Sequence, residues 1–532
     1  MRQVTFYQKC LRIFLVLELL SFSLSFGQAA KGKLQPLPPG LDNYVTRVMK
    51  TFEVPGLALA IVKDGSTLLA KGYGIRRLGE PAPVDAQTLF GIASNSKFFT
   101  ATALGILVDE GKVTWDSPVI NYLPWFQMWD PYVTRELTVR DLLSHRCGLG
   151  LGAGDLLWWP PSDYDRKEIA RRIRFIPPSS SFRTTYAYNN LMFLIAGEVI
   201  EAVSGQAWED FVTHRIFVPL GMKTSSARIS DTVKRANVAG THASIEGQVR
   251  LVKPFLVDSI NPAGGILSNA EDMARWITVH LNAGQLEGER RLYSERVARE
   301  LGNIVTPRSI PAMPAELAPL RPNFLGYGLG IGVRDYRGFK MLQHTGGLPG
   351  YVSQVTMLPE AKLGVVVLTN QEAGEAFSAI TYHVIDYYLG ASGFDWVAAY
   401  QKVKEKREAE LKEAAKKAEA THDSSSRPSL PLERYAGIYQ DAWYGDIEIT
   451  KSDEKLRLRF THTPSLVGDL IHWQYDTFIV RWDDRELRAD AYITFSLNPD
   501  GSIDQAKMKA VSPATDFSFD FQDLLLRPKK KN

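Results

Sequence analysis

The sequence predicts two domains: an α+β domain, in which helices flank an antiparallel sheet, followed by a small antiparallel β-barrel. The chain has 532 residues, too many for one ordinary hydrophobic core. Strand-like and helix-like segments are mixed between about residue 40 and residue 395, whereas the segments after residue 430 are almost all strand-like. A run rich in lysine and glutamate separates the two regions.

The N-terminus has the composition of an export signal. Positive residues precede a mostly apolar run over residues 13–26, which is short for a membrane span. Small residues at 27–29 provide a cleavage point. We therefore expect residues 1–29 to be a bacterial-type signal peptide that sends the chain to the periplasm or the medium. Glu18 interrupts the apolar run, so an uncleaved membrane anchor is the alternative.

Composition limits the partners and the chemistry. The formal net charge is +3 and the only basic run is the last few residues, so no nucleic-acid partner is expected. The two cysteines are Cys10, inside the predicted signal, and Cys147, so the mature chain is expected to have no intrachain disulfide. The histidines show no metal-ligand spacing, and His145 is expected to brace the end of a helix. Neither a metal nor an organic cofactor is predicted.

Residues 30–395 are predicted to form the first domain. Two apolar runs around Lys63-Asp-Gly-Ser are typical of a β-hairpin over residues 57–74. A continuous apolar run at 363–370 predicts a buried strand. Helical patterns follow Ser94 and recur at 139–144 and 191–203.

Residues 396–430 predict a charged helix and a flexible linker. Lysine and glutamate are interleaved up to about residue 420, with favourable i,i+4 pairs at Glu408–Lys412 and Glu413–Lys417. Apolar residues at coiled-coil positions are sparse, which favours a solvated helix over a coiled-coil partner. The serine-rich stretch 421–429 is typical of a linker.

Residues 431–532 predict the accessory barrel. Asn498-Pro-Asp-Gly is a turn between two strands, and the tryptophans and tyrosines of this region suit a small barrel interior. Antiparallel strands over this length can close as a barrel or half-barrel. The region contains no nucleophile with a base, so it is expected to restrict access, bind a partner or join subunits. The predicted strands are 446–450, 455–460, 477–482, 491–497 and 505–511.

The first candidate site is Ser94-Asn-Ser-Lys97. Serine is a weak nucleophile that needs a neighbour to take its proton. Residues at i and i+3 share a helix face, and the apolar residues after Lys97 predict a helix that buries it. Burial lowers the pKa of a lysine, and a neutral amine is a base. The pattern alone is weak evidence, because a helix-capping serine followed by a solvated lysine has the same sequence.

Two later motifs strengthen the first. Tyr188 and Asn190 lie two residues apart on a loop that enters the apolar helix at 191–203, so both side chains can point the same way. The phenol can pass a proton if nearby ammonium charge lowers its pKa. Gln343-His-Thr-Gly-Gly347 follows an apparent strand, and its small residues allow a substrate backbone to approach a strand edge closely.

These motifs, in this order and at these separations, resemble those of the penicillin-binding-protein and class C β-lactamase-like serine hydrolases: Ser94-x-x-Lys97, Tyr188-x-Asn190 and His344-x-Gly346. Residues 137–149 and 261–276 resemble two further stretches of that family. Less specifically, residues 435–439 and 443–446 resemble the lipocalin-like barrel that some members carry at the C-terminus.

The resemblance implies a β-lactamase-like fold, with a helical subdomain beside the sheet, and an acyl-enzyme mechanism. Ser94 would attack the substrate carbonyl, Lys97 would activate it, and Tyr188 would pass the proton to the leaving group. Whether Lys97 or Tyr188 is the acylation base stays open. The oxyanion hole would consist of the backbone N–H groups of Ser94 and Gly347. The substrate would be bound and oriented by Asn190, His344, Thr345 and Gly346.

One departure from the family pattern affects the expected substrate. His344 stands where penicillin-recognising relatives usually carry a lysine whose charge holds a substrate carboxylate. A histidine is largely neutral at pH 7, which argues against efficient recognition of β-lactams or of free D-Ala-D-Ala carboxylates. Substrate choice is expected to depend on loops that carry Trp125, Trp129, Trp158 and Trp159.

The leading prediction is an exported serine hydrolase that cleaves ester or amide bonds of small acyl, D-amino-acid or peptide substrates through an acyl-Ser94 intermediate. A β-lactamase or a cell-wall D-Ala-D-Ala peptidase is the first alternative. A non-catalytic binding protein that kept the fold is the second, although the intact Ser94, Lys97, Tyr188 and Asn190 argue against it. No oligomeric state is predicted.

Overall fold

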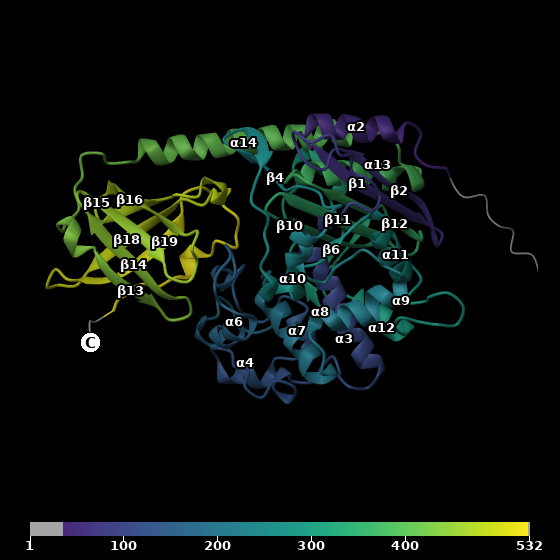
Figure 1. Cartoon of the computed structure of the whole chain (residues 1–532), viewed down its shortest axis with the longest axis horizontal. Coiled ribbons are helices and arrows are strands. Elements are labelled where there is room, and N and C mark those ends of the chain that lie inside the picture. Colours follow the sequence, from purple (N-terminus) through teal and green to yellow (C-terminus); the bar gives the residue numbers. More distant parts are fainter. Residues whose placement is uncertain (1–35, 530–532) are drawn as a thin grey trace, which may run out of the picture. The chain divides into compact units, whose positions relative to one another are not determined.

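The computed structural model describes residues 36–529 (Figure 1). The predicted signal peptide, residues 1–29, lies outside the described residues. From Pro39 onward the chain forms one compact unit that contains both the α+β region and the barrel. Within the described part, no single helix is long and apolar enough to cross a membrane, although one bent pair of helices passes the same test together.

The first region is built on an eight-stranded antiparallel sheet. β1 and β2 form the predicted hairpin, and the predicted apolar strand is β12, which pairs with both β1 and β11. In the order in which they lie side by side, the strands are β2 (Ser66–Gly74), β1 (Gly56–Lys63), β12 (Leu363–Thr369), β11 (Tyr351–Leu358), β10 (Phe339–Leu348), β9 (Gly332–Tyr336), β8 (Leu325–Tyr327) and β7 (Thr306–Pro307).

Helices cover this sheet, which explains why its central strands are apolar. β1 and β12 are buried along almost their whole length, as expected of strands that are covered on both faces. α11 (Ala270–Leu281) packs against β1 and β12, and α13 (Gly374–Tyr388) packs against β11 and β12. Figure 1 shows the sheet between these two helices, with α2 (Leu41–Thr51) beside α13.

The remaining helices of the first region surround α3 (Ser96–Asp109) and α7 (Leu191–Ser204), which are mostly buried and contact each other. Both follow the predicted apolar patterns. α5 (Val139–Leu142) is shorter than the predicted 139–144, because the chain leaves the helical conformation and His145 adopts a φ of 56°. The other helices are α4 (Pro131–Glu136), α6 (Arg166–Arg172), α8 (Trp208–Val212), α9 (Val218–Leu220), α10 (Asn261–Gly264) and α12 (Glu295–Leu301). Two short sheets pair β3 (Phe90–Gly91) with β6 (Leu267–Ser268) and β4 (His242–Ile245) with β5 (Gln248–Leu251).

The charged segment is a single long helix, α14 (Trp396–Ala420). Its first turn is buried, whereas most of its later positions are exposed, as predicted for a solvated helix. The two predicted i,i+4 pairs are not among its ion pairs. Instead, Lys406 and Arg407 pair with Glu316 and Glu375 of the first region. A different local pair, Lys404 with Glu408 at 4.0 Å, is present along the helix.

The C-terminal region is a nearly closed antiparallel barrel. The order of strands is β19-β18-β17-β16-β15-β14-β13-β20, and a bridge between Ala506 and Leu526 brings the segment before β20 back to β19. Buried aromatic rings, Trp443 and Trp482 among them, fill the interior as predicted. The sequence did not predict β13, β16 and β20. The strands are β13 (Gly437–Asp441), β14 (Gly445–Ser452), β15 (Lys455–Phe460), β16 (Val467–Gln474), β17 (Thr477–Trp482), β18 (Ala491–Leu497), β19 (Ile503–Ala510) and β20 (Arg527–Pro528).

The barrel is tied to the first region by side chains on several elements. Arg172 donates to the backbone oxygen of Trp443 at 2.9 Å. Lys253 pairs with Asp484 at 2.7 Å, and Arg488 pairs with Glu372 at 2.8 Å. A further set of contacts, described below, reaches the candidate active site.

Cys147 is buried and is a free thiol. Burial raises the pKa of this thiol to about 11, which keeps it protonated and disfavours a role as nucleophile. Residues 36–529 contain no group of three or more histidine, cysteine or acidic side chains that could hold a metal ion.

Candidate active site

Ser94 lies in a short turn between a strand and a buried helix. It belongs to the 3₁₀ turn Ala93–Asn95, which follows β3 and leads into α3. Ala93 has a φ of 50°, in the left-handed region that alanine rarely adopts. Asn95 Nδ2 donates to Ser353 Oγ at 2.8 Å and so anchors the turn to β11. The strained, anchored backbone fixes the direction of the half-buried Ser94 side chain.

Lys97 is fully buried one helical turn beyond Ser94. Its Nζ lies 3.1 Å from Ser94 Oγ, 2.7 Å from Asn190 Oδ1 and 2.8 Å from the backbone oxygen of Ala263. The oxygens of Asn190 and Ala263 can only accept hydrogen bonds, so each needs an N–H of Lys97. A neutral Lys97 that satisfies both of them has its lone pair left for Ser94. The serine and lysine of the first motif are thus brought together as predicted.

Burial decides the charge of this lysine. It lowers the pKa of Lys97 to about 7, while the nearby carboxylate of Asp155 favours the ammonium form. Burial likewise raises the pKa of Asp155 to about 7. The two groups titrate as a coupled pair near neutral pH, where an appreciable fraction of Lys97 is a free amine.

Tyr188 contacts the same hydroxyl group. Its phenol donates to Ser94 Oγ at 2.7 Å, and Lys97 Nζ lies 4.8 Å from the centre of its ring. Desolvation raises the pKa of Tyr188 well above its ordinary value. The lowered pKa that would favour proton transfer by this phenol is not found, because desolvation outweighs the hydrogen bond with Ser94. Tyr188 is a neutral hydrogen-bond donor in this site.

Asn190 links the lysine to a buried carboxylate. Its Oδ1 accepts from Lys97, and its Nδ2 donates to Asp155 Oδ2 at 2.8 Å. Asp155 also accepts from Trp158 Nε1 at 2.9 Å. Asn190 and Trp158 were predicted from the sequence, whereas Asp155, at the start of the short 3₁₀ turn Asp155–Leu157, has no local pattern to mark it.

His344 is nearly buried and neutral. Its Nε2 is 2.8 Å from the hydroxyl of Tyr327, and its Nδ1 is 2.6 Å from the backbone oxygen of Thr345. Burial and the charge of Lys97 lower the pKa of His344 to about 3. The predicted neutrality of this histidine at pH 7 is therefore supported by its surroundings.

The strand that carries His344 has a free edge beside Ser94. β10 pairs with β9 only as far as Gln343, whereas its pairing with β11 continues to Leu348. In the part of the chain that the structure describes, no strand pairs with the other edge of residues 344–348. Gly346 is required here, because a Cβ atom would lie 2.2 Å from the backbone oxygen of Ile92. This close approach places β10 against the turn that holds Ser94.

A cavity of about 520 Å³ opens above these groups. Trp158 and Trp159 line it, as the sequence analysis expected. Trp125 and Trp129 are not among its lining residues and are exposed instead, so their predicted role in substrate choice is not supported. The candidate site residues that line the cavity are Ser94, Tyr188, Asn190, His344, Thr345 and Gly347.

The barrel supplies part of the cavity wall. Asp516, Phe517 and Ser518, in the loop after β19, line the cavity together with residues of the first region. The Phe517 ring packs edge-on against Tyr188, with ring centres 5.8 Å apart. These residues were not predicted from the sequence, because the barrel region has no nucleophile with a base of its own. The mixture of acidic, aromatic and hydroxyl side chains at 516–520 is the one local feature of the sequence that could have indicated a contribution to the cavity.

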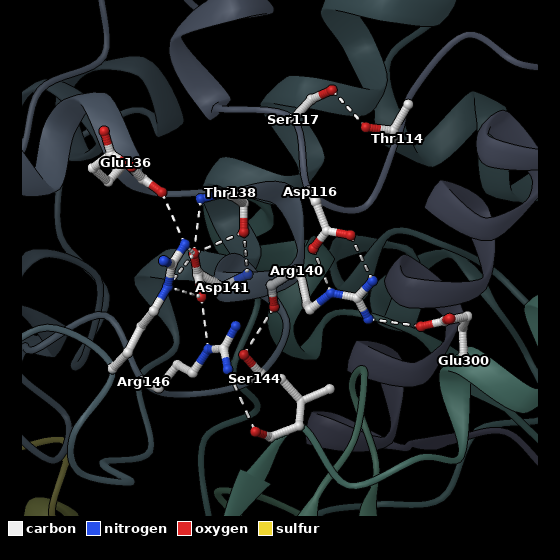
Figure 2. Close-up of polar contacts among 12 residues, drawn as sticks. Thr114, Asp116, Ser117, Glu136, Thr138, Arg140, Asp141, Ser144, Arg146 and Glu300 are labelled. Carbon is white, nitrogen blue, oxygen red and sulfur yellow. Dashed lines mark hydrogen bonds and ion pairs between the residues drawn. The ribbon is translucent and has the colours of Figure 1, made fainter.

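An ion cluster around the buried carboxylate of Asp141 braces the loop that carries Tyr188. Asp141 accepts from Thr138 Oγ1 at 2.7 Å, from Arg146 at 2.6 Å and from Arg183 at 2.6 Å. Figure 2 shows Asp141 between Thr138 and Arg146. The backbone of Arg183 in turn donates to the backbone oxygen of Arg146 at 2.8 Å. The cluster therefore joins α5 to the segment that leads into Tyr188.

His145 completes this brace. It is fully buried, and its Nδ1 accepts from the backbone N–H of Asn189 at 3.1 Å. Its ring also lies 4.4 Å from that of Tyr188, measured between ring centres. His145 lies beyond the end of α5 and supports the loop that carries Tyr188, so its bracing role extends further than the predicted helix end.

The chain is similar to known proteins over most of its length. Unguisins hydrolase of Aspergillus violaceofuscus is 28% identical over 485 residues, which cover 82% of this chain and 81% of that protein. An octameric penicillin-binding protein homologue from Pyrococcus abyssi shares the fold with a TM-score of 0.58 and 22% identity, covering 91% of this chain and 98% of that one. D-amino acid amidase from Ochrobactrum anthropi shares it with a TM-score of 0.52 and 23% identity, covering 66% and 98%.

Family models match both regions. Residues 421–528 match a domain of unknown function, DUF3471. Residues 41–389 match the model described as Beta-lactamase, which spans more than half of the chain and includes all three motifs at the cavity. The chain therefore belongs to the Beta-lactamase family of serine hydrolases.

Proposed function

We propose that the protein hydrolyses ester or amide bonds of small acyl, D-amino-acid or peptide substrates through an acyl-Ser94 intermediate. The observation that carries this proposal is the convergence of Lys97 Nζ and Tyr188 OH on Ser94 Oγ at 3.1 Å and 2.7 Å, beside an open cavity. A nucleophile, a base and a proton donor within hydrogen-bond reach form the arrangement that acyl transfer requires.

Lys97 is the base that the geometry favours for acylation. Its lone pair faces Ser94, and its pKa of about 7 leaves it partly neutral at neutral pH. Tyr188 is protonated and donates to Ser94 Oγ, so in the free enzyme it cannot accept the serine proton. Ser94 Oγ forms a bond to the substrate carbonyl carbon while its proton moves to Lys97 Nζ.

Proton return completes the cycle. Tyr188 gives its phenol proton to the leaving oxygen or nitrogen, and the proton that Lys97 took from Ser94 restores the phenol. The oxyanion that forms on the carbonyl oxygen lies between the backbone N–H groups of Ser94 and Gly347, as in the family pattern. Water then attacks the acyl-Ser94 ester with the same groups acting in the reverse order, which frees the acid product and Ser94.

The free edge of β10 fits a peptide-like substrate. Among the described residues no strand pairs with this edge of residues 344–348, and an extended substrate can pair with it as an added strand. Two charged side chains, Arg308 and Asp516, also line the cavity. One cationic and one anionic group suit substrates that carry charged termini near the scissile bond.

A β-lactamase or D-Ala-D-Ala peptidase activity is the second candidate, and Arg308 is the observation that favours it. No carboxylate of the described residues lies within ion-pair distance of this guanidinium, and Arg308 lines the same cavity as Ser94. It can supply the positive charge for a substrate carboxylate that the neutral His344 does not.

Replacing Arg308 with glutamine is expected to raise the KM about tenfold for substrates with a free carboxylate, and to leave the KM of uncharged esters within about twofold. The reason is the loss of one charge-assisted hydrogen bond that only anionic substrates make. Steady-state kinetics with a matched pair, a D-alanyl ester with a free carboxylate and its methyl ester, measures the difference. Equal KM changes for both substrates would show that Arg308 does not bind the carboxylate.

The proposed function is tested by the intact mass of the purified protein after brief incubation with an activated ester and, separately, with benzylpenicillin. An ester adduct that is absent from Ser94→Ala is expected, because Lys97 Nζ lies 3.1 Å from the Ser94 hydroxyl and can activate it. A stable penicillin adduct would place the second candidate first. No adduct and no turnover with either reagent would contradict the enzymatic proposal and favour a non-catalytic binding protein.

We also propose that residues 1–29 direct export and are removed. The positive leader, apolar run and small residues support this proposal. Expression of the full chain in a bacterial host is expected to give a periplasmic protein whose mass corresponds to a start at residue 30. A membrane-bound product of full mass would favour the uncleaved anchor.

A further inference from the structure

The loop that follows β19 of the barrel reaches the polar groups behind the nucleophile. Ser518 and Asp520 are both almost fully buried, although they belong to a surface connection of the barrel. Polar side chains of a connecting loop are ordinarily exposed, and a buried pair needs partners. The partners of both residues lie in the first region, at Gly154–Leu156.

Asp520 holds the backbone of this segment. Its Oδ2 accepts from the backbone N–H of Gly154 at 2.6 Å, and its Oδ1 accepts from the backbone N–H of Leu156 at 3.0 Å. Both bonds flank Asp155 and are buried. A carboxylate that accepts two backbone N–H groups on either side of a residue fixes the direction in which that residue's side chain leaves the chain.

Ser518 holds the side chain of Asp155 itself. Four consecutive hydrogen bonds then join the barrel to the nucleophile. Ser518 Oγ donates to Asp155 Oδ2 at 2.9 Å, and Asn190 Nδ2 donates to the same oxygen at 2.8 Å. Lys97 Nζ lies 2.7 Å from Asn190 Oδ1 and 3.1 Å from Ser94 Oγ.

We propose that the barrel completes the catalytic centre: Ser518 and Asp520 are positioning residues that fix Asp155, and through Asn190 they set Lys97 against Ser94. This inference rests on the proposed acyl-Ser94 mechanism. It assigns the barrel a part in the reaction, beyond the restriction of access that its sequence suggests.

The charges around this chain of hydrogen bonds determine its effect on pH dependence. Lys97 faces the carboxylate of Asp155, the neutral rings of His145 and His344, and the protonated phenol of Tyr188.

Asp155 faces Lys97 on one side and Asp520 on the other. Burial and repulsion by Asp155 raise the pKa of Asp520 well above its ordinary value. Loss of the Ser518 donor destabilises the Asp155 carboxylate and so raises the pKa of Asp155 further. A neutral Asp155 no longer favours the ammonium form, and the pKa of Lys97 falls.

Acylation by an activated ester is measured in single turnovers across pH for the full-length wild type, Ser518→Ala and Thr515→Val. Ser518→Ala is expected to lower the plateau rate of acylation about tenfold, which corresponds to the free energy of one hydrogen bond to a charged group. It is also expected to move the acidic limb of the pH–rate profile, where the rate falls as Lys97 is protonated, to lower pH. Thr515→Val is the matched control, because this hydroxyl is in the same loop and has no hydrogen-bond partner among the described residues. It is expected to change neither quantity.

Asp155→Asn separates positioning from folding. It removes the carboxylate through which Ser518 acts. Adding Ser518→Ala to Asp155→Asn is therefore expected to change the plateau rate of acylation, and the rate along the acidic limb of the pH–rate profile, by less than about twofold. If Ser518→Ala instead acted by unfolding the barrel, its loss of activity would add to that of Asp155→Asn. It would then lower the midpoint of thermal unfolding in both the wild type and the Asp155→Asn variant.

Two results would overturn the inference, and they differ from each other. If the wild type forms no acyl-Ser94, the proposed function is wrong and the inference falls with it. If the wild type acylates and Ser518→Ala matches Thr515→Val in plateau and limb, the barrel loop does not position the lysine and only the inference is wrong.

Discussion

Replacing Lys97 with methionine is expected to lower the rate of Ser94 acylation by about 10³-fold, within the range by which a positioned general base accelerates proton transfer. Methionine is unbranched and close to lysine in length, so it fills the fully buried site without a cavity. It removes the lone pair that faces Ser94 and the two donors to Asn190 and Ala263. Burst kinetics with a chromogenic ester measure the acylation rate directly.

The same lysine gives the wild type a defined pH dependence. Below a pH of about 7 Lys97 is mostly an ammonium ion and cannot accept the serine proton, so acylation is expected to fall as the pH drops through this value. Above it the amine is neutral and the rate reaches a plateau. Lys97→Met is expected to lose this limb. The buried neutral His344 contributes no titration between pH 5 and pH 8, because its pKa is about 3.

Lys112→Met is a suitable control for the first prediction, since this exposed lysine lies on the surface and pairs only with Glu110 among the described residues. Its acylation rate is expected to equal that of the wild type. A loss of less than tenfold in Lys97→Met would contradict the assignment of the base. In that case Tyr188→Phe is expected to show the larger defect, and Tyr188 would be the acylation base.

The sequence predicted the part of the site that short spacing encodes. Ser94 and Lys97 are three residues apart at the start of one helix, and Tyr188 and Asn190 are two apart at the start of another, so local geometry alone aligns each pair. The convergence of the two pairs depends on the packing of α3 against α7, which no local pattern encodes.

Partners that are distant in the sequence could not be predicted. Asp155 and Ser518 are separated by 363 positions, and their hydrogen bond depends on how the barrel docks. Neither residue is part of a periodic pattern or a motif. The charged helix shows the same limitation: Lys406 and Arg407 pair with Glu316 and Glu375 across the fold, and the predicted neighbours along the helix do not pair.

The barrel strands that escaped prediction differ from those that were found. β16 combines His472, Trp473 and Gln474 at its end, and a register shift interrupts its pairing there. β20 has only two residues, Arg527 and Pro528, too few for any alternation of apolar and polar positions. These strands form because neighbouring strands present unpaired edges to them, which is a property of the assembled sheet and not of the segment.

Replacing Asp141 with alanine is expected to destabilise the protein by about 3–5 kcal/mol, the loss that follows when one partner of a buried ion pair is removed. Asp141 is fully buried, and its carboxylate accepts from Thr138, Arg146 and Arg183. Alanine leaves the two guanidinium groups without their counter-charge and removes the capping box at the start of α5. Urea unfolding at pH 7, followed by near-ultraviolet circular dichroism, measures the difference.

The pH dependence of this difference identifies its electrostatic origin. Burial disfavours the Asp141 carboxylate, but hydrogen bonds from Arg183 and Thr138 outweigh it and hold the pKa of Asp141 below 3.8. A carboxylate with a lowered native pKa stabilises the fold above its unfolded pKa, and this contribution is lost as the pH falls through the native value. The wild type is therefore expected to keep its advantage over Asp141→Ala at pH 5 and to lose it progressively as the pH falls below the ordinary pKa of an aspartate.

Asp116→Ala provides the matched control, because Asp116 also pairs with an arginine of this region, Arg140, but its side chain is 72% exposed (Figure 2). An exposed pair contributes about 0–1 kcal/mol, so this variant is expected to unfold almost as the wild type does. If Asp141→Ala behaved like Asp116→Ala, solvent would be screening the guanidinium groups of Arg146 and Arg183 and the cluster would not brace the Tyr188 loop. A large loss for Asp141 alone would tie the stability of the first region to the segment that presents Tyr188 to Ser94.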